Sequence, residues 1–168
     1  PSKLRYNDNM TNLKEQISAI SKEIGISKIG FTTADNFDYL EKSLRLSQEK
    51  GTNSGFEHQN IEERIKPKLL LDNAKTIISI AVAYPNKLPQ LPGKSPYKRG
   101  KFSSSSWGVD YHTILTEKMA RLSERIAELT DDFDHKAMVD TGALVDTAVA
   151  RRAGIGFIGK NGLVISKE

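Results

Sequence analysis

The run Thr76-Ile-Ile-Ser-Ile-Ala-Val-Ala-Tyr84 is continuous in β-branched and apolar residues. A run without a polar face is typical of a strand that is buried on both faces. Shorter apolar stretches at 28–32, 136–139 and 163–165 are further strand candidates. Because helical periodicity lies between these stretches, we expect an α/β or α+β layered domain.

Helices are expected wherever apolar residues recur at helical spacing. The first expected helix covers 11–24, where Asn12 and Glu15 resemble a capping box and Gly25 is a stop signal. The other helical segments are expected at 37–50, 61–65, 111–129 and 144–153.

The composition is that of a globular domain. Of 168 residues, 38% are hydrophobic and 27% are charged. No apolar run approaches the roughly 20 residues of a membrane span. We expect residues 1–9 to be a cloning remnant or a disordered N-terminus, and 10–168 to form one domain. The absence of cysteine excludes disulfides, thiolate zinc sites and iron–sulfur ligation by these residues.

The glycine-rich segment 154–162 satisfies the dinucleotide pattern G-x-G-x-x-G and nearly satisfies a phosphate loop. Both motifs need a strand before the glycines and a helix after them, whereas the order here is helix, glycines, strand. Nucleotide binding is therefore rejected. Gly154 is expected to end a helix. Gly156 and Gly159 permit either a tight connection or close backbone approach to a flat group.

Asp140 is the main catalytic candidate, because it follows the strand expected at 136–139. A carboxyl group with apolar neighbours can serve as a proton donor. The alternative is that Asp140 or Thr141 caps the next helix. Asp110 is expected to cap the helix that begins near Tyr111. The three histidines, including His112, are too scattered to suggest a metal site.

A basic loop lies within the aperiodic segment 85–106. Its cations are Lys94, Lys98, Arg99 and Lys101, with Tyr97 among them and Phe102 directly after the last. Cations bind phosphates and aromatic rings stack on bases, so the loop is a candidate RNA contact. An ordinary solvated loop has the same composition, and the net charge of +4 permits an anionic partner without requiring one.

Four stretches together carry a family resemblance. They are Arg64-x-x-Pro67 followed by the strand at 74–83, Trp107-Gly-Val-Asp110-Tyr111-His112, Val139-Asp140-Thr141-Gly142, and Ala153-Gly-Ile-Gly-Phe-Ile-Gly-Lys160-Asn161. In order and content they resemble the epoxyqueuosine reductases, over most of 10–168. The last two stretches are the most specific.

The resemblance implies a nitroreductase-like, cobalamin-binding N-terminal domain with a mixed central sheet and flanking helices. In the family, a ferredoxin-like module with two 4Fe–4S clusters and tRNA-binding helical repeats follow this domain. The implied reaction is cobalamin-dependent reduction of epoxyqueuosine to queuosine at the wobble position of tRNA, the last step of queuosine biosynthesis. An external electron donor, no membrane partner, a monomeric full-length enzyme and a cytoplasmic location are expected with it.

By the same resemblance, Asp140 is the proton donor, because an epoxide oxygen leaves readily only when it is protonated. The residues expected to line a base-off cobalamin are Arg64, Ser103, Asp110, Asp140, Gly156, Lys160 and Asn161. The basic loop is expected to contact tRNA. Many members have an arginine where this chain has Thr147, so one contact to the cofactor is in question.

Two other functions stay open on the sequence alone. One is a flavin-dependent oxidoreductase of the nitroreductase type, which flavin absorbance in place of a corrin spectrum would reveal. The other is a non-catalytic RNA-binding module, for which Asp140 is irrelevant. Because no cysteine is present to hold a cluster, the 168 residues alone are expected to be inactive.

Overall fold

The structure, a computed structural model, describes residues 2–83, 100, 102–103, 106 and 108–167, with side chains from residue 12 onward. The described helices and strands are, in chain order, α1 (Ser2–Glu23), β1 (Lys28–Thr33), the 3₁₀ turn η1 (Asp38–Leu40), α2 (Glu41–Glu49), α3 (Ile61–Ile65), the 3₁₀ turn η2 (Pro67–Leu69), β2 (Thr76–Ala81), α4 (Tyr111–Ala127), α5 (Asp146–Arg152), β3 (Phe157–Ile158) and β4 (Val164–Ile165). The expected mixture of helices and strands is confirmed.

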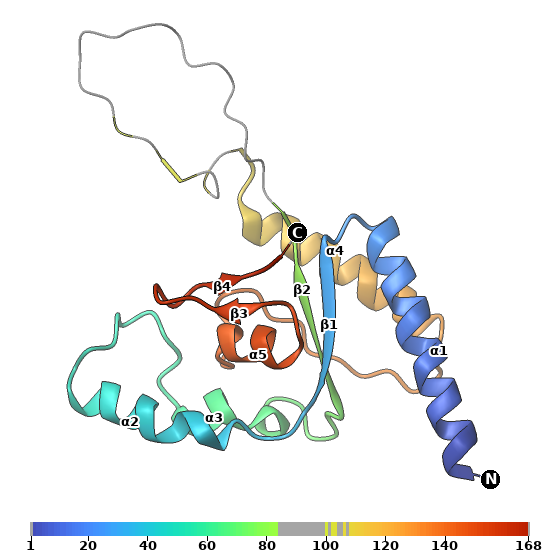
Figure 1. Ribbon diagram of the computed structural model, residues 1–168, viewed down its shortest axis with the longest axis horizontal. Coiled ribbons are helices and arrows are strands. Elements are labelled where there is room, and N and C mark those ends of the chain that lie inside the picture. The colour runs from blue at the N-terminus through green and yellow to red at the C-terminus, as the bar shows by residue number, and fades with distance from the viewer. Residues whose placement is uncertain (1, 84–99, 101, 104–105, 107, 168) are drawn as a thin grey trace, which may run out of the picture.

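The centre of the fold is the antiparallel pair β1–β2, whose register runs from Lys28 opposite Ala81 to Thr33 opposite Thr76. Figure 1 shows α1 and α4 on one side of this pair, and α5 with the β3–β4 hairpin on the other. The result is three layers, in which helices cover both faces of a short two-stranded sheet.

Each face of the β1–β2 pair has its own apolar core. On one face, Ile78 and Ile80 of β2 pack against a buried cluster that consists of Ile17, Ile20, Ile24, Ile26, Leu122 and Ile126. On the other face, Ile77 packs against a second cluster that consists of Phe37, Ile65, Leu144, Ala148 and Val149. Alternate residues of a strand point to opposite faces, so one run of sequence supplies both cores. Apolar residues thus meet both faces of β2, as expected, although residues 77–81 are only half-buried.

Three helix ends follow the expected chemistry. Asp110 caps α4, and its Oδ1 accepts a hydrogen bond from the N–H of His112 at 2.9 Å. Gly25 and Gly154 follow the ends of α1 and α5 with φ of +76° and +77°. This left-handed conformation is the one that glycine adopts readily after a helix.

Three expected helices have different bounds. α1 begins at Ser2, so Asn12 lies inside the helix and the capping box of Asn12 and Glu15 is wrong. The side chain of Asn12 instead accepts a hydrogen bond from Gln16 at 2.9 Å. The helix expected at 37–50 is divided into η1 and α2, and the helix expected at 144–153 begins only at Asp146.

The expectation of a mixed central sheet is wrong for the described residues. They form two separate sheets, each of two antiparallel strands. The strand expected at 136–139 is also wrong, because this segment pairs with no strand. Lys136 and Ala137 are exposed, and the segment is held by the side chain of Met138, which packs against the second core. β2 ends at Ala81, before Tyr84.

The glycine-rich segment contributes to a β-hairpin. β3 and β4 pair in antiparallel register, so two strand residues lie within the segment 154–162 that was expected to be a loop. A Cβ atom on Gly156 would lie 2.3 Å from the carbonyl oxygen of Ile165. The sequence left two interpretations of Gly156 open, a tight connection or close approach of the backbone to a flat group. In this structure its close neighbour is the backbone of β4.

We expect Gly156→Ala to lower the free energy of unfolding by about 1–3 kcal/mol, which is typical of overpacking. The new Cβ has to displace the backbone of β4. Gly159→Ala is the matched control, because a Cβ there would meet only the side chains of Ile165 and Asn161, which can move. Denaturant unfolding of the two variants measures the difference. Equal losses of unfolding free energy in the two variants would mean that the β3–β4 hairpin shifts at Gly156 to accommodate the new Cβ atom.

Candidate functional site

Asp140 has an unusual backbone conformation. Its φ is +55°, and among the residues that the structure describes it is the one residue other than glycine with positive φ. The N–H of Thr141 donates to the carbonyl oxygen of Val139 at 2.5 Å, so Asp140 lies at the apex of a three-residue turn. Strained backbone of this kind is concentrated at functional sites. The alternative of a helix cap is wrong, because the N-cap of α5 is Val145.

Two side chains from the first turn of α4 contact the carboxylate of Asp140. The hydroxyl of Tyr111 donates to Oδ2 at 2.8 Å, and Nε2 of His112 lies 3.4 Å from the same oxygen. The other ring nitrogen of His112, Nδ1, lies 2.8 Å from Oδ1 of Asp110. The two rings stack with their centroids 4.1 Å apart. We call these four residues the Asp140 cluster; in it, one imidazole lies between two carboxylates.

The charges of the Asp140 cluster shift the pKa values of its members. The pKa of His112 is raised, chiefly by the hydrogen bond to Asp110 and further by the charges of both carboxylates. The pKa of Asp110 is lowered, first by the backbone N–H of His112 and then by its ring. The pKa of Tyr111 is raised, because its hydroxyl donates to Asp140. The hydrogen bond to Asp110 and the nearby carboxylates therefore favour the protonated form of the His112 imidazole.

A cavity of about 560 Å³ lies beside Asp140, and its walls come from β2, α4, α5 and the segment 133–140. Its polar wall includes Tyr111, Asp140, Asp146 and Thr147, while residues such as Leu115 and Met119 make much of the remainder apolar. An apolar cavity with a few polar groups at one place is the usual form of a small-molecule site.

Asp146 brings a second carboxyl group to this cavity, from the first turn of α5. Although the residue retains contact with solvent, neighbouring protein atoms partly desolvate its carboxyl group. This desolvation, with a smaller contribution from the charge of Asp140, raises the pKa of Asp146 to about 6. Two carboxyl groups, those of Asp140 and Asp146, therefore line the cavity close enough together for their charges to interact.

We expect Asp146→Asn to raise Tm more at about pH 7.5 than at about pH 4. The pKa in the folded state, about 6, lies above the ordinary value of 3.8, so ionising Asp146 costs stability in the folded protein. The loss of stability is absent when the pH is below the ordinary pKa of 3.8 and grows as the pH rises toward the folded-state pKa of about 6. Above that pKa it stays constant. Thermal unfolding across this pH range measures it, with the exposed Asp132→Asn as control. A gain in Tm that is the same at every pH would contradict the shift.

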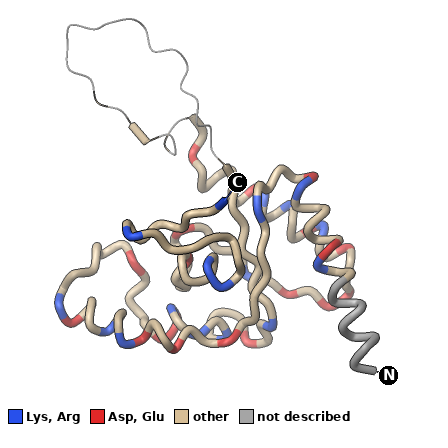
Figure 2. The backbone as a smooth tube through the Cα atoms, in the orientation of Figure 1, with Lys and Arg blue, Asp and Glu red and all other residues tan. Residues whose placement is uncertain are grey.

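The other residues expected to bind the cofactor lie on separate elements. Arg64 is half-buried on α3, whereas Lys160 and Asn161 are exposed in the turn between β3 and β4, whose tip is basic in Figure 2. The carbonyl oxygen of Ser103 accepts a hydrogen bond from the N–H of Ser106 at 3.0 Å. In the described part of the chain, no hydrogen bond or ion pair joins Arg64, Lys160 or Asn161 to the Asp140 cluster.

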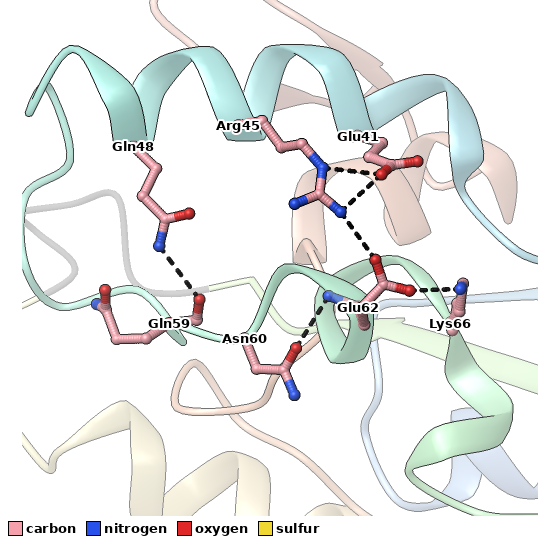
Figure 3. A network of polar contacts seen from close by, with 7 residues as sticks. All are labelled: Glu41, Arg45, Gln48, Gln59, Asn60, Glu62 and Lys66. Carbon is pink, nitrogen blue, oxygen red and sulfur yellow. Dashed lines mark hydrogen bonds and ion pairs between the residues drawn. The ribbon is translucent and has the colours of Figure 1, made fainter.

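A charged network connects α2 to α3, the helix that carries Arg64 (Figure 3). Arg45 donates to Glu41 at 2.8 Å and to Glu62 at 3.0 Å, and Glu62 also pairs with Lys66. Because these side chains are largely solvent-exposed, each ion pair contributes little to stability by itself. The structural effect of the whole network is to fix the orientation of α3 relative to α2.

The cations of the basic loop, Lys94, Lys98, Arg99 and Lys101, lie outside the described residues. Within the described ranges, no group of three or more histidine, aspartate or glutamate side chains is arranged to hold a metal ion. None of the helices in those ranges is both long enough and apolar enough to cross a membrane.

Sequence reasoning did not assign Tyr111, His112 or Asp146 to the site. The sequence signals for the first two were their position directly after the helix cap Asp110 and their place in the stretch 107–112, which carries part of the family resemblance. The first of these places them on α4, but neither connects them to Asp140, which follows much later in the chain.

Polar donor groups are present at three of the positions expected to bind cobalamin. Cobalamin carries amides and a phosphate at its periphery. The exposed ammonium of Lys160, the amide of Asn161 and the guanidinium of Arg64 are complementary to those groups. A cluster of the 4Fe–4S type is held by thiolates, and the 168 residues contain no cysteine.

Comparison with known proteins gives a consistent result. The family model described as epoxyqueuosine reductase QueG, DUF1730, matches residues 64–141. The epoxyqueuosine reductase of Lactococcus garvieae is 57% identical over 159 residues, which cover 95% of this chain and 45% of that protein. The structure of epoxyqueuosine reductase from Streptococcus thermophilus has a TM-score of 0.89 and 70% identity, over 94% of this chain and 42% of that one.

Two further solved structures are similar to this chain. An epoxyqueuosine reductase with an epoxyqueuosine-modified tRNA stem loop has a TM-score of 0.87 and 47% identity, over 93% of this chain and 42% of that one. The Bacillus subtilis enzyme with its catalytic aspartate loop swung out of the active site has a TM-score of 0.87 and 45% identity, over 94% and 42% of the two chains. The chain thus spans less than half the length of these relatives. By sequence and by fold, the chain belongs to the epoxyqueuosine reductase family.

Proposed function

We propose that residues 10–168 form the cobalamin-binding catalytic domain, of nitroreductase-like type, of an enzyme that reduces epoxyqueuosine to queuosine in tRNA. The observation that carries the proposal is the Asp140 cluster: a strained, exposed aspartate, contacted by Tyr111 and His112, at the edge of a largely apolar cavity. A related enzyme has a catalytic loop that bears an aspartate and moves. The three-residue turn at Asp140 is the corresponding feature that we propose here.

Asp140 acts as the proton donor in this proposal. Reductive opening of an epoxide releases oxygen, which leaves readily only after it is protonated. The exposed carboxyl group of Asp140 can reach a substrate that lies outside the turn, since its side chain is 61% exposed. Tyr111 and His112 orient that carboxyl group through its Oδ2 atom.

Cobalamin, when bound, supplies the reducing chemistry of the reaction. The residues of this chain that we propose to hold it are Arg64, Ser103, Asp110, Asp140, Gly156, Lys160 and Asn161. Thr147 lines the cavity at the position where many relatives have arginine, so its hydroxyl offers a weaker polar contact there. The two 4Fe–4S clusters belong to the remaining length of the protein, together with the contact to an external electron donor.

Absorbance of the purified full-length protein after incubation with hydroxocobalamin or with flavin mononucleotide tests this assignment. We expect a corrin spectrum to remain with the protein after gel filtration, and Lys160→Ala together with Asn161→Ala to weaken its retention. Flavin bands in place of the corrin spectrum would assign the domain to the nitroreductase-type oxidoreductases.

Transfer RNA is the proposed macromolecular partner, because a solved relative contains a modified tRNA stem loop. A monomeric enzyme acting on tRNA in the cytoplasm is the corresponding expectation. We propose the basic loop, Lys94, Lys98, Arg99 and Lys101, as the RNA contact of this domain.

Changing these four cations to serine in the full-length enzyme is expected to weaken tRNA binding and to flatten its salt dependence. Each lost phosphate contact lowers the log–log slope by roughly 0.7–0.9. Titrations across a salt series measure the slope, and cobalamin affinity is the control. An unchanged slope would mean that these charges face only water, and loss of cobalamin would mean that the loop covers the cofactor.

A further inference from the structure

The reduction proposed above consumes more protons than Asp140 can hold. Conversion of an epoxide to an alkene and water takes two electrons and two protons. The electrons come through the proposed corrin cofactor, and a carboxyl group carries one transferable proton. The second proton therefore has to reach the site during turnover, and the side chains that contact Asp140 are candidates to deliver it.

Within the described residues, two side chains contact the Asp140 carboxylate, namely Tyr111 at 2.8 Å and His112 at 3.4 Å. Since the hydroxyl of Tyr111 donates to a carboxylate, the pKa of Tyr111 is raised above an already high value, and it releases its proton poorly. The imidazole of His112 is the group whose ordinary pKa suits proton exchange near neutral pH. Its side chain is 40% exposed, so water can reach it.

Contacts with Asp110 and Tyr111 fix the orientation of the His112 ring. Asp110 contacts Nδ1 at 2.8 Å and also accepts the backbone N–H of His112 at 2.9 Å, while Tyr111 stacks on the ring. With Nδ1 occupied by Asp110, Nε2 is the nitrogen that faces Asp140. This is the arrangement by which a carboxylate orients an imidazole that exchanges protons through its second nitrogen.

We propose that His112 is the residue that returns protons to Asp140, and that Asp110 is the positioning residue that aims its Nε2 atom; this proposal rests on the function proposed above. In the step, the Nε2–H bond of His112 breaks and an O–H bond forms at Asp140. The neutral imidazole keeps its Nδ1–H toward Asp110. A hydronium ion or buffer acid from bulk solvent then protonates Nε2 again, and its conjugate base returns to solvent. The titratable groups facing this exchange are Asp110, Asp140 and Tyr111, with Asp146 close enough to Asp140 for their charges to interact.

The test uses the full-length enzyme with cobalamin and an epoxyqueuosine-containing stem loop, comparing His112→Gln with wild type. Glutamine retains a hydrogen-bonding side chain but carries no exchangeable proton of suitable pKa. We expect kcat to fall by about 10²-fold or more with KM little changed. Added imidazole should restore part of kcat, with a pH dependence that follows the imidazole. His58→Gln is the matched control, because His58 also pairs with an exposed carboxylate, Glu63, at 2.7 Å.

A second measurement tests the geometry without turnover. In ¹⁵N-histidine NMR spectra, Asp110→Asn should lower the pKa of His112 and remove its preference for Nδ1–H, whereas His58→Gln should leave His112 unchanged. Normal kcat in His112→Gln, or a loss of kcat that imidazole does not restore, would overturn the proton-return role. Normal kcat in Asp140→Asn would instead overturn the role of Asp140 as proton donor, and absence of epoxyqueuosine reduction by the wild-type enzyme would overturn the proposed function, so the failures are distinguishable.

Discussion

Replacing Asp140 by asparagine in the full-length enzyme is expected to reduce the rate of epoxyqueuosine reduction by about 10²–10⁴-fold, the usual contribution of a general acid. The substitution isolates proton donation, because asparagine adopts positive φ more readily than most residues and can keep the strained turn. Its amide also preserves the shape of the carboxyl group. We therefore expect cobalamin binding to be retained.

Single-turnover kinetics with reduced enzyme measure the loss, and the absorbance of bound cobalamin checks the cofactor. Asp132→Asn is the control, since this exposed residue lies in the same segment between α4 and α5. Near-normal turnover in Asp140→Asn would mean that the strained turn has a structural role and that another group donates the proton.

Phe37→Ala is expected to lower the free energy of unfolding by about 3–5 kcal/mol, the range for truncating a buried phenylalanine. Phe37 is 1% exposed and lies in the second core with Ile65 and Leu144. The guanidinium of Arg152 lies 3.4 Å from its ring centroid, so the substitution also removes a cation–π contact between α5 and the segment after β1.

Phe56→Ala is a matched control for this prediction, because the same side chain there is 97% exposed. Its truncation should change stability by no more than about 0.5 kcal/mol. Denaturant midpoints of the two variants give the comparison, and Phe37→Leu provides a milder variant if Phe37→Ala does not fold. Similar losses at the two positions would contradict the burial of Phe37.

The sequence predicted those elements whose signals are local. The bounds of α3 followed from an apolar pair ahead of Pro67, and α4 followed from the cap Asp110 and its helical periodicity. The segment 136–139 was wrongly predicted as a strand, because its apolar residues pack by side chain rather than by backbone pairing. The contacts of Tyr111 and His112 with Asp140 join two distant parts of the chain, and no local pattern encodes such a contact.

Gly156 shows the same limit of prediction from local sequence. The sequence indicated that the backbone comes close to something at this position, and the structure identifies a close neighbour as the carbonyl oxygen of Ile165 in β4. A pattern can indicate the need for a small residue, whereas the identity of the neighbour depends on how the hairpin closes.

The most direct test of the proposed function is the conversion of a synthetic, epoxyqueuosine-containing tRNA stem loop by the full-length enzyme, with nucleosides quantified by mass spectrometry. The reaction is run under reducing conditions with cobalamin, with flavin mononucleotide, or with no added cofactor. We expect queuosine only in the reaction with cobalamin, and none when Asp140 is replaced by asparagine. Queuosine formed with flavin alone, or no queuosine under any of the three conditions, would contradict the proposed function.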